Sequence, residues 1–385
     1  MGTTNTLILD QAESLTDNTS PYPASLSDEA NLLTRLMRSD EMIGGALENA
    51  LEIDKLLADP ALRWDEVIRL GRRHGGMPLF YKTLKDRPHA LVPANIKTRL
   101  QNDFHRIGMH ISMQIEMLRK VNSSFNAAGI PLLFFKGIQL GAQAYGNPIW
   151  RKPGDLDILI HAHQIDDARA VLTNLGFDTR MSPVQEEEQI ARQQQLTFYG
   201  KTTDVDVHFS LQQRSFLKMS YAATFDSENV WKRATHFDFD GISIPCLSAE
   251  DQFCLLCVHS AKHGWYRLYM MADIAAFMAN VKLNWHKVSI RAKRIKAERM
   301  LSLSVLLANK LFETPIPKPI ASLIEKDASL PALSEQILFR LFDDDAEEKS
   351  FQFHRIQTGL FPKWSQKALY LSYVTAQHLK RKRSE

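Results

Sequence analysis

The segment that most constrains this chain is Gly154-Asp-Leu-Asp-Ile-Leu-Ile160, in which two aspartates open an otherwise apolar strand. Side chains alternate between the two faces of a β-strand, so Asp155 and Asp157 point the same way. Two carboxylates side by side at the edge of a core repel each other and lose hydration, and a bound divalent cation relieves both costs. Pro153-Gly154 supplies a turn directly before the pair. The segment therefore predicts a strand end where a substrate can reach metal-binding carboxylates.

The composition allows a substantial core and excludes several classes of protein. Of the 385 residues, 44% are hydrophobic and 24% are charged, and this length predicts two or three structural units. A net charge of +3 gives no argument for nucleic-acid binding, and no apolar run approaches the roughly 18 residues of a membrane span. The first residues are polar and acidic, unlike a secretory signal peptide, and 3 cysteines do not form a disulfide framework. We therefore expect a cytoplasmic protein.

Hydrophobic spacing divides the chain into four parts. Residues 1–27 are rich in Ser, Thr, Asn and Asp and predict a flexible lead-in. Apolar residues at helical spacing predict a helical region over 28–128. Strand and helix signals alternate over 129–247, and the pattern is helical again over 248–385, with Ser248 as the expected N-cap of the first helix there. The predicted class is α+β, with a small mixed β-sheet core between N- and C-terminal helical regions.

The central part carries specific strand and helix signals. They predict strands at 130–135, 155–161, 195–200 and 204–209, helices at 138–145 and 164–175, and a hairpin with an Asp-Gly turn over 235–244.

Basic residues and a glycine accompany the acidic strand. Lys136-Gly137 ends the first strand; glycine permits a close backbone approach, and a helix N-terminus directly after it favours a phosphate. Arg151 and Lys152 add positive charge just before Asp155. Acids for a metal and bases for phosphates, within about twenty residues, indicate a phosphoryl-transfer site.

A third carboxylate is expected from the strand at 204–209. By alternation, Asp204, Asp206 and His208 share one face, and a neighbouring strand would bring Asp204 or Asp206 beside Asp155 and Asp157; the sequence leaves this choice open. Three carboxylates on adjacent strands can hold two Mg²⁺ ions about 3.5–4 Å apart. His208 is open to two interpretations, a hydrogen bond to a catalytic aspartate or substrate, or a satisfied residue of the core or rim. Asp-x-Asp alone is more often a solvated strand edge, and it is the neighbouring lysine, glycine and arginine that favour function.

Four segments together resemble a known family. They are "WDEVIRLGRRHGGMPLFY", "PLLFFKGIQLGAQAYGNPIWRKPGDLDILI", "DVDVHFSL" and "LCVHSAKHGWYRLYMMADIAAFM". They resemble the uncharacterised nucleotidyltransferase family of bacterial polysaccharide and peptide-modification clusters, within the DNA polymerase β-type nucleotidyltransferase superfamily. The resemblance covers most of residues 60 to 280.

The resemblance implies a nucleotidyltransferase core that uses Mg²⁺ or Mn²⁺ and an NTP such as ATP. It implies Asp155 and Asp157 as metal ligands and Asp206 as the third carboxylate and activator of the acceptor. The reaction would transfer a nucleoside monophosphate to a sugar, a peptide or protein side chain, a small molecule or an RNA end, and would release pyrophosphate. One departure is that many superfamily members have Gly-Ser after the first strand, where this chain has Lys136-Gly137. Abortive-infection nucleotidyltransferase toxins carry a similar Lys-Gly arrangement.

Three residues of the C-terminal region are further candidates. Lys262 and Arg267 are of phosphate-binding types and would reach over the cleft to the triphosphate. The alternative is an ordinary solvated helix face; the resemblance favours a function for Lys262, and less strongly for Arg267. Asp273 is expected to orient one of these bases.

Two other motifs are expected to be structural. Cys254 and Cys257, with His259 and His263 nearby, formally offer zinc ligands, but their apolar helix indicates buried core cysteines. The run Gly71-Arg-Arg-His-Gly-Gly76 lacks P-loop spacing and a preceding strand, so an inter-helix turn is expected.

The terminal basic run and the function itself each keep alternatives. Lys380–Arg383 is either a solvated tail, which we favour, or a contact for an anionic membrane or nucleic acid. Besides the general nucleotidyltransferase, two readings stay open: a toxin-like transferase acting on tRNA ends, and a non-catalytic nucleotide-binding or scaffold protein. The first predicts a basic groove; the second predicts nucleotide binding without turnover.

Overall fold

The structure is a computed structural model that describes part of the chain. The described residues are 27–38, 46–211, 227–343, 350–361, 364–368 and 370–372. Residues 1–26 of the predicted lead-in and the basic run Lys380–Arg383 lie outside them.

The N-terminal region is helical. Its helices are α2 (Asp28–Leu36), α3 (Ala46–Leu57), α4 (Trp64–His74), α5 (Met77–Leu84) and α6 (Ala94–Ala127). Ser27 caps α2 by accepting a hydrogen bond from the backbone N–H of Ala30. Gly75 ends α4 in the left-handed conformation, with φ 74°, which glycine adopts without steric cost. The glycine run at 71–76 therefore contains a turn between α4 and α5, as predicted.

The sheet lies in the middle of the chain. Its strands are β1 (Leu133–Phe135), β2 (Leu156–Leu159), β3 (Gln195–Phe198), β4 (Val205–His208), β5 (Thr235–Phe239) and β6 (Ile242–Cys246). They form one six-stranded sheet in the order β3-β4-β2-β1-β6-β5. The pairs β2–β4 and β1–β6 are parallel, and β1–β2, β3–β4 and β5–β6 are antiparallel. The sheet is thus mixed, and the β5–β6 hairpin turns at Asp240-Gly241 as predicted.

Short helices connect the strands. They are α7 (Gly137–Tyr145), α8 (Ile165–Asn174), α9 (Pro183–Gln193) and α11 (Ser227–Lys232), with 3-10 turns η2 (Pro148–Trp150) and η3 (Ala162–Gln164). The helices α7 and α8 match the predicted segments closely, whereas α9 was not predicted. Its polar sequence carries little apolar periodicity; it begins with a capping box between Ser182 and Gln185, which was the available signal.

The C-terminal region is helical again. Its helices are α12 (Ala249–Lys262), α13 (Leu268–Asn280), α14 (Trp285–Arg294), α15 (Glu298–Phe312), α16 (Lys318–Glu325), α17 (Leu330–Leu341) and α18 (Ser350–Gly359). Ser248 caps α12 as expected, accepting a hydrogen bond from the N–H of Asp251 at 3.3 Å. Within the described ranges, no helix is both long and apolar enough to cross a membrane.

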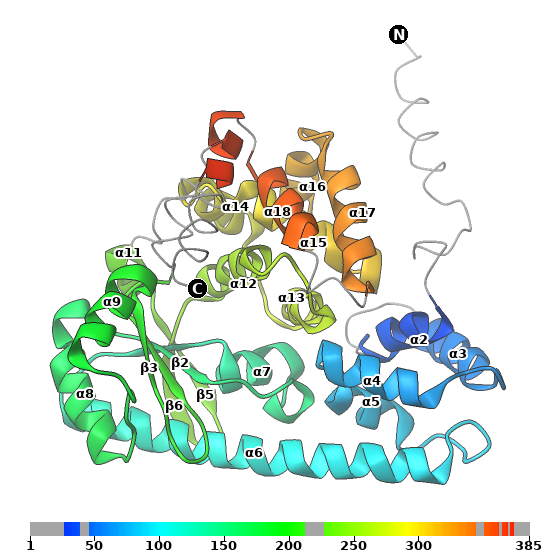
Figure 1. Ribbon diagram of the computed structural model, residues 1–385, viewed down its shortest axis with the longest axis horizontal. Helices are drawn as coiled ribbons and strands as arrows, with labels where there is room; N and C mark the ends of the chain where they lie inside the picture. Colours follow the sequence, from blue (N-terminus) through cyan, green and yellow to red (C-terminus); the bar gives the residue numbers. More distant parts are fainter. Residues whose placement is uncertain are drawn as a thin grey trace, which may run out of the picture.

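The sheet has two different faces, and this decides where its polar groups lie. The alternate residues Leu156 and Ile158 of β2 belong to one hydrophobic core with Leu118 and Val121 of α6. Leu159 belongs to a second core, which contains the buried side of α12 and much of the helical regions. Figure 1 shows α6 running along one side of the sheet and α12 on the other. Residues of β2 that alternate with Leu156 and Ile158 therefore face α12.

This architecture confirms the predicted fold class. The molecule is α+β, with a small mixed sheet and helices on both of its faces.

Candidate active site

The two acidic strands lie side by side and in register. β2 and β4 pair in parallel with Asp157 opposite Asp206 and Leu159 opposite His208. Asp157, Asp206 and His208 each offer a ligand atom, and these atoms all lie within 4.8 Å of one another. Among the described residues, this is the sole cluster of three or more acidic, histidine or cysteine side chains with metal-binding spacing. The parallel pairing of β2 with β4 thus brings Asp157 and Asp206 together although they are far apart in the sequence.

Asp155, the remaining predicted ligand, lies outside this cluster, but its carboxyl responds to the charges of the other two aspartates. It stands two residues before Asp157, and burial together with the charges of Asp206 and Asp157 raises its pKa to about 6. Burial and the charge of Asp157 also raise the pKa of Asp206. Both shifts come first from burial and then from repulsion between the carboxylates.

Asp157 differs from Asp155 and Asp206 because a lysine forms an ion pair with it. Lys136 Nζ lies 3.0 Å from Asp157 Oδ1, and His208 Nε2 lies 3.1 Å from the same oxygen. Burial by itself would raise the pKa of Asp157, but Lys136 and His208 hold it at about 2. His208 thus hydrogen-bonds an aspartate of the site and is also a satisfied, buried residue: its ring packs edge-on against Phe135, with the ring centroids 5.0 Å apart.

The turn at Lys136-Gly137 brings the end of β1 close to Asp155, the residue directly before β2. Lys136 has φ 59° and ψ −147°, a conformation that residues other than glycine rarely adopt. Gly137 also has a positive φ, and a Cβ built on it would lie 3.0 Å from the carbonyl oxygen of Asp155. The glycine thus permits the close approach, and the strained lysine lies where its ammonium reaches Asp157.

Asp204 and Asp206 have different environments. Asp204 Oδ1 accepts a hydrogen bond from the backbone N–H of Gly200 at 3.1 Å, so this carboxylate holds the β3–β4 turn. Asp206 Oδ1 accepts a hydrogen bond from Thr197 Oγ1 at 2.6 Å. Asp206 is in register with Asp157, which makes it the better candidate for the third carboxylate.

Sequence reasoning missed Thr197 and Gln114. Thr197 stands opposite Asp206 in the β3–β4 ladder, and the alternation of polar and apolar residues along β3 was the available signal. Gln114 of α6 is buried; its Nε2 donates to the carbonyl oxygen of Gly154 and, at 3.0 Å, to Thr203 Oγ1. Gln114 thus fixes the loop before Asp155, and no pattern in the sequence around Gln114 predicts this contact.

Helix α12 contributes basic side chains to a cavity that also contains Asp157 and Asp206. A cavity of about 250 Å³ is lined by Lys136, Asp157, Asp206, His208, Lys262, His259 and His263, among others. Burial and the neighbouring Lys136 lower the pKa of Lys262 to about 8. Burial lowers the pKa of His263 to about 4 and that of His259 well below its ordinary value, so both rings are neutral near pH 7. Lys262 is thus placed in the cavity by the structure.

Arg151 and Arg267 have protein partners. Arg151 Nε lies 2.9 Å from Asp273 Oδ2, and Asp273 Oδ1 accepts a hydrogen bond from Tyr145 at 3.0 Å. Asp273 was expected to orient Lys262 or Arg267, but the structure pairs it with Arg151 and Tyr145 instead. Arg267 lies over the ring of Tyr266, 4.8 Å from its centroid, at the residue that precedes α13.

Cys254 and Cys257 are buried and form no disulfide, and the same holds for Cys246 in β6. Burial raises the pKa of the Cys257 thiol to about 12 and that of Cys254 well above its ordinary value. These thiols are core residues, as expected.

The donor set is suited to a hard divalent cation and to phosphates. Carboxylate oxygens are the ligands that Mg²⁺ prefers, and ammonium groups beside them bind phosphate. A mixed sheet that carries carboxylates on adjacent strands, next to Lys136 and Lys262, defines a site of the phosphoryl-transfer class.

The family comparison agrees with this class. The chain belongs to the uncharacterised nucleotidyltransferase family, whose sequence model matches residues 60–313, about two thirds of the chain. The match confirms the resemblance found in the sequence. No curated protein matches the chain.

Solved structures of antibiotic nucleotidyltransferases are remotely similar. A crystal structure of ANT(2")-Ia in complex with adenylyl-2"-tobramycin has 12% identity and a TM-score of 0.36, covering 48% of this chain and 98% of that one. A solution structure of the antibiotic-resistance factor ANT(2'')-Ia has 13% identity and a TM-score of 0.35, with coverage of 48% and 92%. The lincosamide antibiotic adenylyltransferase LnuA, bound to lincomycin, has 17% identity and a TM-score of 0.30, with coverage of 42% and 94%.

Proposed function

We propose that this nucleotidyltransferase moves a nucleoside monophosphate from an NTP to an acceptor in a Mg²⁺-dependent reaction that releases pyrophosphate. The observation that carries the proposal is the register of β2 and β4, which sets Asp157 opposite Asp206 with Asp155 two residues away. The reaction forms a bond between the acceptor oxygen and the α-phosphorus and breaks the bond from that phosphorus to the pyrophosphate oxygen. The acceptor proton leaves to a base.

The acidic group fits a divalent cation on physical grounds. The raised pKa values of Asp155 and Asp206 reflect burial and mutual repulsion, and both effects diminish when a cation binds. We propose Asp155, Asp157 and Asp206 as the residues that would hold Mg²⁺ or Mn²⁺. Bound there, the metal would neutralise phosphate charge and make the acceptor hydroxyl more acidic. His208, a nitrogen donor that already contacts Asp157, is assigned to orienting that aspartate.

The basic side chains are proposed to bind the phosphates. Lys136 and Lys262 line the cavity that contains Asp157 and Asp206, and with a pKa of about 8 the Lys262 amine remains mostly protonated near pH 7. A phosphate is proposed near the N-terminus of α7, which begins at Gly137. This supports a triphosphate that enters between β1 and α12.

Different roles are proposed for Arg151 and Arg267. Because Asp273 already holds Arg151, we revise its role from direct phosphate contact to fixing the segment that leads to Asp155. Arg267 keeps its proposed contact with the outer phosphates. Asp206 is proposed as the base for the acceptor proton, since its pKa is raised and Thr197 fixes the orientation of its carboxylate.

A cytoplasmic setting is part of the proposal. The three free, buried cysteines are consistent with a reducing compartment. The proposed reaction also needs NTP as substrate and Mg²⁺ as cofactor, which the cytoplasm would supply.

The test is nucleotide transfer by the purified protein. Each NTP, labelled at the α-phosphate, is incubated with Mg²⁺ or Mn²⁺ and a cell extract, and transfer of label and release of pyrophosphate are measured. We expect transfer by the wild type and a loss of at least about 10³-fold in Asp157→Asn, since the metal site would be broken.

The matched control is Asp238→Asn, which neutralises an exposed aspartate in β5 of the same sheet. It should transfer label like the wild type. Equal labelling by the wild type and Asp157→Asn would overturn the proposal, and nucleotide binding without turnover would favour the non-catalytic alternative.

A further inference from the structure

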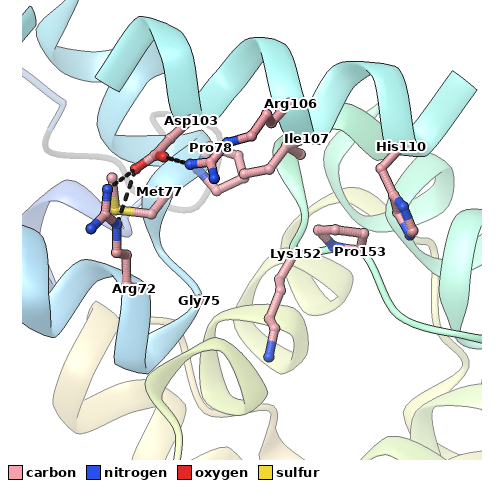
Figure 2. Close-up of a pocket in the computed structure, with 10 residues that line it drawn as sticks. All are labelled: Arg72, Gly75, Met77, Pro78, Asp103, Arg106, Ile107, His110, Lys152 and Pro153. Atoms are coloured by element: carbon pink, nitrogen blue, oxygen red, sulfur yellow. Dashed lines mark hydrogen bonds and ion pairs between the residues drawn. The ribbon is translucent and has the colours of Figure 1, made fainter. Parts of the chain in front are cut away.

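A second and larger cavity lies next to the loop that carries Asp155. It has a volume of about 570 Å³ and is lined by Arg72, Gly75, Met77, Pro78, Asp103, Arg106, Ile107, His110, Lys152 and Pro153. These residues come from the end of α4, the start of α5, one stretch of α6 and the loop before β2 (Figure 2). This volume is in the range of small-molecule sites. We call it the helical-side cavity.

The charges of this cavity do not balance. Asp103 is nearly buried, with 6% of its side chain exposed, and it forms ion pairs with both Arg72, at 3.0 Å, and Arg106. Figure 2 shows the two guanidinium groups on either side of this carboxylate. Lys152 is a third cation of the lining, and Asp103 is the sole acidic side chain among the described lining residues. The described lining thus holds three cations and one carboxylate, and only two of these cations pair with it, which favours an anion.

The arginines are held in place while they remain accessible. The side chains of Arg72 and Arg106 are 53% and 70% exposed, whereas Asp103 beneath them is buried. Asp103 already restricts the rotamers of both arginines in the unbound protein. Each arginine therefore loses less conformational entropy when a ligand binds. Met77, Pro78 and Ile107 supply an apolar wall beside them, so the cavity combines an anion-binding side with a surface for a nonpolar group.

The cavity is physically connected to the proposed catalytic loop. Pro153 stands two residues before Asp155, so their Cα atoms are at most about 7 Å apart. Asp103, Arg106, Ile107 and His110 follow i, i+3, i+4, i+7 spacing and hence share one face of α6. Gln114, four residues further along that face, holds the carbonyl oxygen of Gly154. One face of α6 thus lines the cavity and fixes the loop of Asp155.

Gly75 allows the loop to close against α4. A Cβ built on Gly75 would lie 3.1 Å from Cδ of Lys152 and 3.2 Å from the ring of Tyr269. The Lys152 ammonium lies over that ring, 5.4 Å from its centroid. Burial, with Arg267 and Arg151 nearby, lowers the pKa of Lys152, in keeping with a shortage of negative charge here.

We propose that the helical-side cavity binds the acceptor, and that the acceptor is a small anionic molecule with a phosphate or carboxylate group and a nonpolar portion. The proposal rests on the proposed function, because it assigns the second substrate of that reaction. The NTP phosphates have their own basic residues, Lys136 and Lys262, in the cavity between β1 and α12. The helical-side cavity is therefore left for the other reactant, directly before Asp155 in the chain.

The test is direct binding of defined probes without catalysis. Full-length protein is titrated calorimetrically, in EDTA and without NTP, with phenyl phosphate, with phenylacetate and with neutral benzyl alcohol. We expect saturable binding of at least one anionic probe and none of benzyl alcohol. The two anionic probes distinguish a phosphate-bearing from a carboxylate-bearing acceptor.

Variants locate the site of binding. Arg106→Gln and Lys152→Gln should each weaken binding of the anionic probe about tenfold, since each removes a charge-assisted contact. The control Arg99→Gln removes a cation of the same helix, which pairs with the exposed Asp65 away from the cavity, and should bind the probe like the wild type. Lys136→Gln, on the nucleotide side, should also bind normally.

Two outcomes overturn the inference. One is the absence of binding by any anionic probe; the other is binding that Lys136→Gln abolishes and the cavity variants leave unchanged, which would place the anion at the metal site. Pyrophosphate release by the same preparations is measured separately. Probe binding at the cavity without any NTP turnover would refute the transfer reaction, and the acceptor role with it, while leaving an anion-binding cavity.

Discussion

Arg151 and Asp273 form an ion pair inside the molecule, with Arg151 Nε 2.9 Å from Asp273 Oδ2 and only 12% and 4% of the two side chains exposed. Tyr145 at the end of α7 donates to the other carboxylate oxygen at 3.0 Å. Residues 145 and 151 flank the segment that leads to the acidic strand, and residue 273 lies in α13. The pair thus ties the segment before β2 to the C-terminal helices.

Removal of Asp273 should be strongly destabilising. Asp273→Ala leaves Arg151 buried without its partner, and breaking a buried pair from one side costs about 3–5 kcal/mol. The free energy of unfolding, measured by urea denaturation, should fall by that amount. The double variant Arg151→Met/Asp273→Leu should recover much of the loss, because it leaves no unpaired charge.

An exposed ion pair provides the comparison. Asp65 is 91% exposed and lies 2.6 Å from Arg99, so Asp65→Ala should change the free energy of unfolding by less than about 1 kcal/mol. Equal effects of Asp65→Ala and Asp273→Ala would contradict the structural role assigned to Asp273.

Lys136 should separate activity from stability. Its φ of 59° and ψ of −147° strain a lysine backbone but suit glycine. Lys136→Gly should therefore be more stable than Lys136→Ala by about 1 kcal/mol, while both lose most transfer activity because the ammonium beside Asp157 is gone. Urea denaturation and the labelled-NTP assay measure the two quantities. A glycine variant less stable than the alanine variant would argue against backbone strain at this turn.

Divalent metal should stabilise the protein through its acidic strands. A ligand that binds only the folded state at about a hundred times its Kd adds about 2.7 kcal/mol, so saturating Mg²⁺ should raise the Tm above that in EDTA. Asp157→Ala and Asp206→Ala should abolish most of the shift in a thermal melt. Asp238→Asn, in β5, should retain it. A metal-induced shift that survives in both Asp157→Ala and Asp206→Ala would place the metal elsewhere.

His74 should make stability depend on pH. The backbone N–H of Leu268 donates to His74 Nδ1 at 3.1 Å, and burial together with Arg73 and Arg267 lowers the pKa of His74 from 6.5 to about 3. The folded pKa lies below the unfolded value, so between the two the unfolded chain binds a proton that the folded chain excludes. The stability that His74 contributes is therefore complete above about pH 6.5 and is lost as the pH falls toward 3.

The loss should amount to about 3 kcal/mol at about pH 4.5. It is measured by urea denaturation across this range, comparing the wild type with His74→Gln. The stability difference between the two should shrink on acidification. His89→Gln, at an exposed position, should give the same pH curve as the wild type, and a parallel curve for His74→Gln would refute the assignment.

The sequence by itself determined the local geometry of the site. Alternation along a strand places Asp155 and Asp157 on one face whatever the strand pairs with, and Lys136-Gly137 marks the end of a buried strand. The hairpin at Asp240-Gly241 and the cap at Ser248 followed from short-range signals. These features depend on neighbours within a few residues, which is why they can be predicted from one chain.

Only the tertiary structure decided which distant groups meet. The register of β2 against β4 sets Asp206 rather than Asp204 opposite Asp157. Both aspartates lie on one face of their strand, so a shift of two residues would exchange them without any change in the local sequence pattern. The pairing of Arg151 with Asp273, and of Gln114 with the carbonyl of Gly154, joins residues 122 and 40 positions apart. Such contacts form because burial in a common core brings the helices and the sheet together, and no local pattern encodes their partners.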